Sequence, residues 1–376
     1  MVNALKINTP LLLLSTVLLS GLTSTAHAQF GNLTIGNDAR SLAMGGAGIA
    51  TGGANRANPA SLAFTKNMRI YFPTVGLRAE GALNEITKLD NVSKFIGGSE
   101  QDKKDAATDM ARKFATRDSL FGFNTGFGVR FGPLEVQANG VAQGKFAPNQ
   151  KLRDWANSNP PAGQNAPSGS GADLSAAALY TLPSVGFGLQ LPARELLIGG
   201  KPKALSIGVG ARLKYVNSVY SHYVATTNGS GTFTSARSSE LGGKDFLEKK
   251  GLAADLGAMG NWEQDGALLS GGVVLTNIIK PSMNFLDVNG NTFNPIVQTI
   301  SAGASFHKGS LTVAGDIVNL TNSPSIRVGG EQKLGPIAIR AGFTTRGGVT
   351  YGLGILGFDI ALGKGQPLEV VQTLRF

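Results

Sequence analysis

Apolar and polar side chains alternate along many segments of this chain. In residues 121–131, FGFNTGFGVRF, every second position is Phe or Val except Thr125, and the positions between them are small or polar. Side chains of a β-strand alternate between two faces, so this segment has one apolar, largely aromatic face and one polar face. The pattern predicts a β-strand whose aromatic face meets an apolar surrounding.

The same alternation recurs from residue 68 to the C-terminus, as in 184–191, 204–220, 325–334 and 337–345, and many segments run 9 to 13 residues. Strands of soluble sheets usually have about 5–6 residues, whereas a tilted strand needs about 9–11 to cross a bilayer. A membrane barrel turns apolar residues toward lipid and small or polar residues toward its lumen, whereas a sandwich buries its apolar face. We therefore predict an all-β fold, a transmembrane antiparallel β-barrel.

Candidate strands begin at fifteen places, near residues 68, 119, 134, 174, 184, 204, 250, 267, 296, 310, 325, 336, 348, 357 and 367. Bacterial single-chain barrels have an even number of strands. Short and long connections should also alternate, and this alternation fails between residues 134 and 220, so one candidate there is expected to be wrong. The prediction is a barrel of about 14 strands.

The chain divides into three predicted parts. Residues 1–28 are typical of a secretory signal peptide, with Lys6, the apolar run 11–22 and the small-residue cleavage signal AHA. Residues 29–67 form an expected N-terminal hatch segment, and 68–376 form the barrel. Within the barrel we expect a helical outer insert at 80–116, from its helical spacing, and long loops at 147–172 and 221–249.

The composition removes several classes of site. The 376 residues include no cysteine, so disulfides and thiolate metal sites are excluded, and the formal net charge is +10. The basic residues are scattered, without a basic helix or an aromatic stacking cluster, so no nucleic-acid partner is expected. The charge suits anionic lipid head groups or a basic lumen better. The lumen-facing candidates are Arg130, Arg212, Lys214, Arg327, Glu331 and Arg340, and Glu331 is expected to pair with Arg327 or Arg340 across neighbouring strands.

The sequence offers little for catalysis, and we expect no enzyme, no cofactor and no metal. After removal of the signal peptide, His222 and His307 are the histidines that remain. His222 follows Ser221, so an esterase site is conceivable, but a solvated loop histidine at a strand end is the favoured interpretation, and no G-x-S-x-G elbow is present. The stretch GLGILG, 352–357, precedes a strand pattern, whereas a dinucleotide motif requires a helix there.

Two stretches near the start, DARSLAMGGAGIA (38–50) and NRANPASLAF (55–64), resemble the start of mature proteins in the FadL/TodX superfamily of outer-membrane transport barrels. Later stretches such as SIGVGARLKY and LTVAGDIVNL look most like the branch named after the plasmid-transfer protein TraF, with PorV-like relatives. The ending LEVVQTLRF is similar to the closing strand of outer-membrane barrels, whose terminal residue, here Phe376, serves as an assembly signal. The resemblance implies a bacterial outer membrane location.

The resemblance also implies a hatch at the periplasmic mouth, with Gly45, Gly46, Asn58, Pro59 and Ala60 in its motif. Between residues 43 and 60 the bulky side chains are Met44, Ile49 and Arg56. Such a segment buries too little apolar surface to fold alone, and its glycines add an entropic cost. We therefore expect the lumen wall to hold it, with Asn58, Pro59 and Ala60 as its fixed point.

Two functions from different classes remain open. The first is passage of small hydrophobic or amphipathic compounds through an outer-membrane β-barrel. The alternative is an accessory outer-membrane barrel of an export or conjugal plasmid-transfer apparatus. A transporter should have an apolar interior, whereas an accessory barrel should have a plugged lumen and a shaped outer loop. Expected partners are outer-membrane lipid and the barrel assembly machinery; hydrophobic small molecules and transfer or secretion proteins are further candidates.

Overall fold

The structure is a computed structural model. It describes residues 39–51, 57–80, 99, 112–161, 164–192, 194–198, 201–229, 233–237, 246–286, 292–321, 323–345, 348–364 and 368–375. The predicted signal peptide, most of the predicted helical insert and Phe376 lie outside these ranges.

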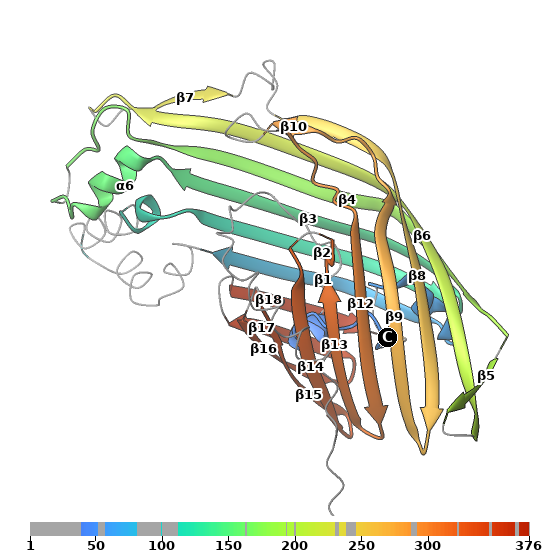
Figure 1. Ribbon diagram of the computed structural model, residues 1–376. Coiled ribbons are helices and arrows are strands. Elements are labelled where there is room, and N and C mark those ends of the chain that lie inside the picture. The colour runs from blue at the N-terminus through green and yellow to red at the C-terminus, as the bar shows by residue number, and fades with distance from the viewer. Residues whose placement is uncertain are drawn as a thin grey trace, which may run out of the picture. The chain divides into compact units, whose positions relative to one another are not determined.

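The protein is an all-β barrel (Figure 1). Fourteen of its described strands form a ring: β1 Arg69–Glu80, β2 Ser119–Phe131, β3 Leu134–Pro148, β4 Gly171–Gln190, β6 Lys201–Thr227, β8 Leu247–Gln264, β9 Ala267–Ile279, β12 Thr299–Lys308, β13 Leu311–Val318, β14 Ser325–Leu334, β15 Ile337–Thr344, β16 Gly348–Ile355, β17 Phe358–Lys364 and β18 Leu368–Arg375. Each pairs antiparallel with its neighbour in this order, and the sheet closes on itself where β1 pairs with β18. The prediction of an antiparallel barrel of about 14 strands is confirmed.

Shorter elements decorate the ring. Strands β5 Arg194–Ile198 and β7 Phe233–Arg237 pair with the two ends of β6, and β10 Phe285–Leu286 pairs with β11 Thr292–Phe293. The helical elements are α2 Ala39–Ala43, the 3-10 helix η1 Pro59–Phe64, and α6 Gln150–Asn157. No helix in the described ranges is both long and apolar enough to cross a membrane.

The two ends of the barrel differ. At one end five connections are two-residue turns, each with a glycine at positive φ, at 132–133, 265–266, 309–310, 335–336 and 356–357. A tight hairpin needs a left-handed residue, which glycine adopts without steric cost. We call this the turn end and the opposite end, which carries α6 and the longer connections, the loop end. The chain enters β1 and leaves β18 at the turn end, because Tyr71 pairs with Arg375 and Arg69 with Arg130.

One strand was expected as two. The sequence suggested separate strands from residues 174 and 184, but both belong to β4, and the error lies in the interval where alternation failed. Pro183 has no N–H to donate, and the register of β4 shifts between Thr181 and Ser184 against β6. Such a shift changes which alternate residues point outward. The exposed apolar residues are therefore Tyr180 and Leu182 before it, and Val185 and Phe187 after it.

Two loops are shorter than expected. The predicted loop 147–172 contains helix α6, since β3 continues to Pro148 and β4 begins at Gly171. The predicted loop 221–249 is largely strand, because β6 extends to Thr227, β7 pairs back onto it, and β8 begins at Leu247. Both corrections have the same cause. The strands β3, β4 and β6 continue to pair beyond the segments where apolar and polar residues alternate clearly.

The outward face of the barrel is apolar. On β2 the side chains of Phe121, Phe123 and Phe127 are exposed, and Phe127 is 42% accessible, whereas Gly122 and Gly126 are buried. A soluble β-protein buries such a face. The structure therefore confirms that the aromatic face of 121–131 points away from the interior of the barrel.

Candidate functional site

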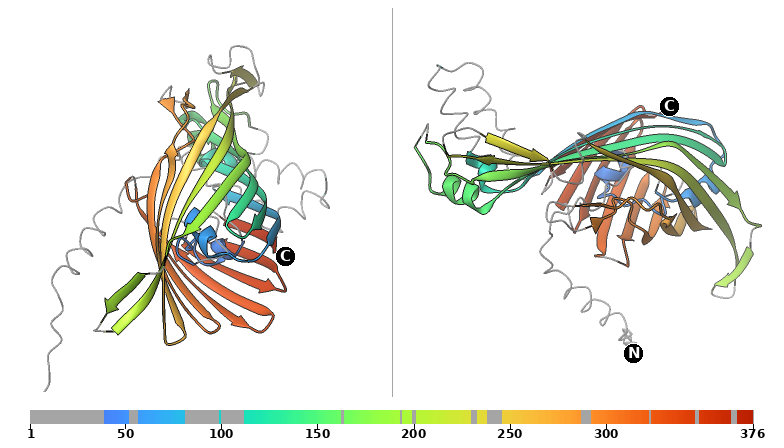
Figure 2. Two further views of the ribbon diagram at one scale, coloured as in Figure 1. Left: turned by 90° about the vertical axis from the view of Figure 1, so that its right-hand side faces the viewer. Right: turned by 90° about the horizontal axis from the view of Figure 1, so that it is seen from above.

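The described N-terminal segments 39–51 and 57–65, which we call the hatch, lie inside the barrel (Figure 2). Helix α2 contacts β15 to β18, and η1 contacts β4, β6 and β8. Inward-facing glycines make room for these contacts. A Cβ atom on Gly329 or Gly342 would collide with the hatch backbone at Met44 and Gly45, and one on Gly210 would collide with Pro59. The wall is therefore shaped to hold this segment closely.

The first part of the hatch turns sharply after α2. Gly45 and Gly46 have φ angles of +69° and +78°, in the left-handed region that glycine adopts readily. The Gly45 amide donates to Thr350 Oγ1 at 2.9 Å, and the Thr350 hydroxyl donates to the Ala43 carbonyl at 3.1 Å. Residues Ala39, Leu42 and Ala43 pack in a buried apolar cluster with Ala361 of β17. The turn is thereby attached to β16 and β17.

Asp316 of β13 holds the next turn of the hatch. Its Oδ2 atom accepts hydrogen bonds from the backbone amides of Gly48 at 2.6 Å and Ile49 at 3.0 Å. Asp316 is almost fully buried, and burial of a carboxylate is costly unless donors surround it. The two amides are such donors. The Ala50 carbonyl accepts a further bond from Ser305 Oγ at 2.7 Å.

Asn58 joins the second part of the hatch to the first part and to the wall. It caps η1, with its Oδ1 accepting from the Ala60 amide at 3.0 Å, and Pro59 occupies the first position of that helix. Its Nδ2 donates to the carbonyls of Ile49 at 3.3 Å and Ala258 of β8 at 3.2 Å. The side chain is fully buried. Asn58 is thus the point where both hatch parts and the barrel meet.

A row of charged residues from four strands, β2, β3, β6 and β8, lies near the turn end. Arg130 and Glu135 are both 0% exposed, and Arg130 Nη2 lies 2.9 Å from Glu135 Oε2. Arg212 Nη2 lies 3.0 Å from Glu135 Oε1, and Lys214 Nζ lies 2.6 Å from Asp255 Oδ1. Buried charges are tolerated when each has an opposite charge and further hydrogen bonds. Arg130 also donates to Thr65 of the hatch at 3.2 Å.

A second charged group holds α2. Arg40 of the hatch donates to both carboxylate oxygens of Glu331, at 2.9 Å and 2.8 Å. Arg340 Nε donates to Glu331 Oε2 at 2.6 Å, and Arg340 Nη1 donates to Asp359 Oδ1 at 2.6 Å. A carboxylate with two arginines is well compensated, because guanidinium groups match both of its oxygens.

The charged residues predicted from the sequence face inward and fall into two groups. Arg130, Arg212 and Lys214 belong to the charged row, and Glu331 and Arg340 belong to the group at α2. Of the two partners expected for Glu331, the structure places Arg340 at hydrogen-bond distance, whereas Arg327 donates to the Gly46 carbonyl at 3.3 Å. Arg130, Arg212 and Arg340 are buried. The sequence reasoning passed over the inward acids and the hydroxyl that complete these contacts. Their signal was an acid or Thr at an alternate strand position, as in Glu135, Asp255, Asp316, Thr350 and Asp359.

His222 corrects one expectation. It was assigned to a solvated loop at a strand end, but it lies within β6 and its side chain is 5% exposed. Its Nε2 is 3.8 Å from Asp173 Oδ1 of β4. Ser221, the neighbour considered for an esterase, is on the opposite face of β6, because adjacent strand residues point in opposite directions. The geometry gives these two side chains no shared site.

Toward the loop end the interior contains a cluster of buried apolar side chains. The segment after β9 folds against the inner side of β6 and β8, with Met283 and Phe285 buried. The rings of Phe285 and Tyr220 are 5.4 Å apart, and Lys249 Nζ lies 4.6 Å from the centre of the Phe285 ring. Buried Val141, Leu179 and Val216 belong to the neighbouring wall. The interior near the loop end therefore adds an apolar cluster, beside buried polar residues such as Ser218 and His222.

Within the described ranges, no group of three or more His, Cys, Asp or Glu residues could hold a metal ion. The glycines of GLGILG stand in β16 and the turn into strand β17, as the pattern indicated. A Cβ atom on Gly352 would collide with Ala43 of the hatch. Gly352 is therefore a small wall position that admits the hatch.

Comparisons with protein-family models and with curated proteins find no match. Among solved structures, a TodX deltaS2S3 mutant described as a monoaromatic hydrocarbon channel has 10% identity and a TM-score of 0.48, over 91% of this chain and 98% of that one. The Pseudomonas putida toluene transporter TodX has 11% identity and a TM-score of 0.44, over 93% and 98%. The Ralstonia pickettii toluene transporter TbuX has 11% identity and a TM-score of 0.37, over 91% and 98%. At these values the similarities assign no function, and the TraF-like and PorV-like branch stays a prediction.

Proposed function

We propose that the protein is a bacterial outer-membrane β-barrel that passes small hydrophobic or amphipathic compounds, and that the hatch closes its turn end. The observation that carries the proposal is the contrast between its surfaces. The outward face is apolar, the interior carries an apolar cluster toward the loop end, and at the turn end the interior holds buried ion pairs and the hatch.

The outward face supports the membrane assignment. Exposed Phe, Leu, Ile and Val side chains ring the barrel, on strands as far apart as β2, β9 and β15. Water would make such a surface costly, whereas lipid accepts it. Short turns of outer-membrane barrels face the periplasm, and here β1 also begins and β18 also ends at the turn end. We therefore place the turn end in the periplasm and the loop end outside the cell.

The interior supports the choice of solute. A hydrophobic compound gains free energy by leaving water for the apolar wall formed by Leu179, Val216 and Tyr220. Farther in, the hatch and the paired charges occupy the interior at the turn end. This arrangement of apolar and charged surfaces favours a compound that is apolar for most of its length. No described feature singles out a protein partner, so the accessory-barrel alternative stays a prediction.

The proposal is tested by uptake in a Gram-negative host lacking its own hydrophobic-compound channels. The probe is N-phenyl-1-naphthylamine, which fluoresces once it has passed the outer leaflet. Cells that carry the barrel should take up the dye several-fold faster than cells that lack it, while entry of a small sugar stays the same. Equal dye uptake at equal amounts of folded barrel would overturn the proposal.

A further inference from the structure

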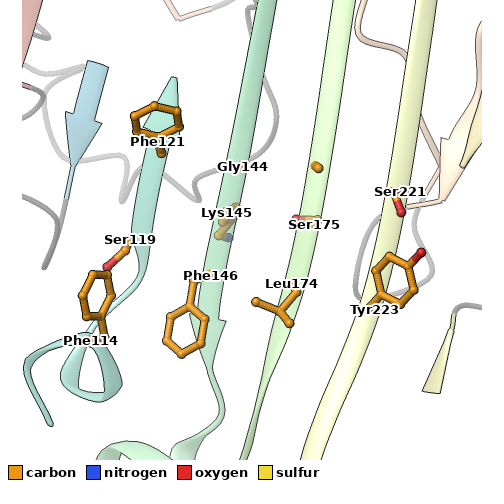
Figure 3. Close-up of a pocket in the computed structure, with 11 residues that line it drawn as sticks. Phe114, Ser119, Phe121, Gly144, Lys145, Phe146, Leu174, Ser175, Ser221 and Tyr223 are labelled. Atoms are coloured by element: carbon orange, nitrogen blue, oxygen red, sulfur yellow. The ribbon is translucent and has the colours of Figure 1, made fainter. Parts of the chain in front are cut away.

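The outward face carries a pocket of about 340 Å³ near the loop end (Figure 3). Four residues on adjacent strands lie in one register row across it: Phe121 of β2, Gly144 of β3, Ala176 of β4 and Ser221 of β6. The row begins with a large aromatic ring and continues with three small side chains. Its small members form the floor of the pocket, and Phe121 forms one side.

Three aromatic rings and a leucine form the remaining walls. Phe146 and Leu174 stand on the next outward row of β3 and β4, and Tyr223 stands on that of β6. Phe114, from the helical turn 112–116 before β2, packs edge-on against Phe146, with ring centres 6.2 Å apart and an interplanar angle of 88°. A Cβ atom added to Gly144 would meet nothing within 4 Å. The floor is therefore open, and the walls are mainly apolar.

The pocket opens on the same side as the apolar band of the barrel. Phe121 and Leu174 are exposed. Among the outward-facing phenylalanines of β2, which include Phe123 and Phe127, Phe121 lies nearest the loop end. An occupant would thus be reached from the outward face and not from the interior. This position separates the pocket from a solute path through the barrel.

The surroundings of the pocket are basic. The segment 112–118 and helix α6 together contain five basic and two acidic residues. Both acids are engaged: Asp118 binds Arg153 at 2.8 Å and Lys145 at 3.4 Å, and Asp154 accepts from Gln150 at 2.7 Å. Clusters of Lys and Arg beside a membrane attract anionic lipid head groups. The basic residues beside Phe114 are Arg112, Lys113 and Arg117.

We propose that this pocket binds an anionic, phosphorylated glycolipid of the outer leaflet, with one acyl chain on the Gly144 floor and a phosphate beside Arg112, Lys113 and Arg117. The proposal rests on the outer-membrane placement proposed above. An acyl chain fits an apolar pocket that continues the lipid-facing band, and a phosphate complements the basic rim.

The test uses the full-length barrel, purified in mild detergent and titrated with lipid A under native mass spectrometry. The variant Gly144→Leu fills the floor of the pocket. The control variant Gly140→Leu adds the same side chain four residues away on the same face of β3. Gly140 does not line the pocket, and a Cβ atom there makes ordinary contacts. Lys113→Gln with Arg117→Gln removes two charges from the rim. Phosphatidylethanolamine, which has no net charge, is the comparison lipid.

We expect wild type and Gly140→Leu to retain one lipid A, and Gly144→Leu to lower the bound fraction at least five-fold. The double Gln variant should lower lipid A binding and leave phosphatidylethanolamine binding unchanged. Unchanged lipid A binding in Gly144→Leu, or equal binding of both lipids by wild type, would overturn the proposal. The proposal would also be overturned if the Gly144→Leu variant lost binding of N-phenyl-1-naphthylamine but kept binding of lipid A. Cells with Gly144→Leu and cells with the wild type should take up the dye at the same rate. If neither protein supports dye uptake, the result contradicts the proposed transport function and not the lipid site.

Discussion

Arg212 of β6 and Glu135 of β3 form a buried ion pair at 3.0 Å although strand β4 lies between them. The residue of β4 in the same register row is Gly186, which pairs with Glu135 on one side and Arg212 on the other. With no side chain there, the guanidinium crosses the strand. A Cβ atom on Gly186 would lie 3.7 Å from Arg212 Nε and 3.0 Å from Leu62 of the hatch. Arg340 and Asp359 also form an ion pair across a strand, β16, but diagonally: Gly354 pairs with Asp359, whereas Arg340 pairs with Gly352. A Cβ atom on Gly354 would collide with both side chains.

Gly186→Val should weaken the barrel and loosen η1. The branched side chain would occupy the path of Arg212 and press on Leu62, and Glu135 would keep Arg130 as its partner. Breaking a buried pair typically costs about 3–5 kcal/mol, and the retained partner places this case near 3 kcal/mol. Urea unfolding in lipid vesicles measures the difference. Gly271→Val is the matched control, since a Cβ there meets nothing within 4 Å; equal losses from both variants would contradict the role of Gly186.

Asp316→Ala should release the first part of the hatch while leaving the barrel folded. The substitution leaves the amides of Gly48 and Ile49 without their acceptor, and hydrogen bonds to a charged group are worth about 1.5–3 kcal/mol each. Strand β13 keeps its pairing with both neighbours through backbone atoms. Limited proteolysis should then cut within 39–51 at least ten-fold faster. The control variant is Asp154→Ala, at an exposed position of α6. The protease should cut it within 39–51 at the wild-type rate.

Deleting residues 41–64 should open the barrel. These residues carry Asn58 and the turns bound by Asp316 and Thr350, so their removal empties the interior at the turn end. Single-channel conductance in planar bilayers should rise several-fold, while the folded form keeps its resistance to heating in detergent. In the intact protein the same segment should resist protease. Rapid clipping there, together with unchanged conductance after deletion, would show that the segment closes nothing.

Phe127→Asp should reduce folding into vesicles. Phe127 is an exposed apolar residue near the middle of β2, so the carboxylate would face lipid. An acidic residue in this position costs about 2 kcal/mol or somewhat less. Phe127→Ala removes the ring without adding charge and is the matched comparison. Equal folding yields for the Asp and Ala variants would mean that this face does not meet lipid.

Local pattern was sufficient for the faces of the strands but not for every strand boundary. The alternation of Phe121 to Phe131 gave the outward side correctly, and the same rule turned Arg130, Arg212 and Arg340 inward. It failed in β4, where Pro183 and the register shift changed the phase, and at His222, where pairing with Ser175 continues beyond the clear pattern. A strand is stabilised by its neighbours, so its length depends on partners distant in the sequence.

The sequence by itself determined that the chain forms a barrel with an apolar outer face, because the two-residue period of a strand is a local property of consecutive side chains. Only the tertiary structure decided what fills the interior. Gly48 and Asp316 are 268 positions apart, and Arg40 reaches Glu331 across 291. Such contacts arise when the sheet closes and brings β13 and β14 around the N-terminal segment. The charged residues were visible in the sequence, but their partners depend on closure, because a buried charge is stable only where folding supplies its counterpart.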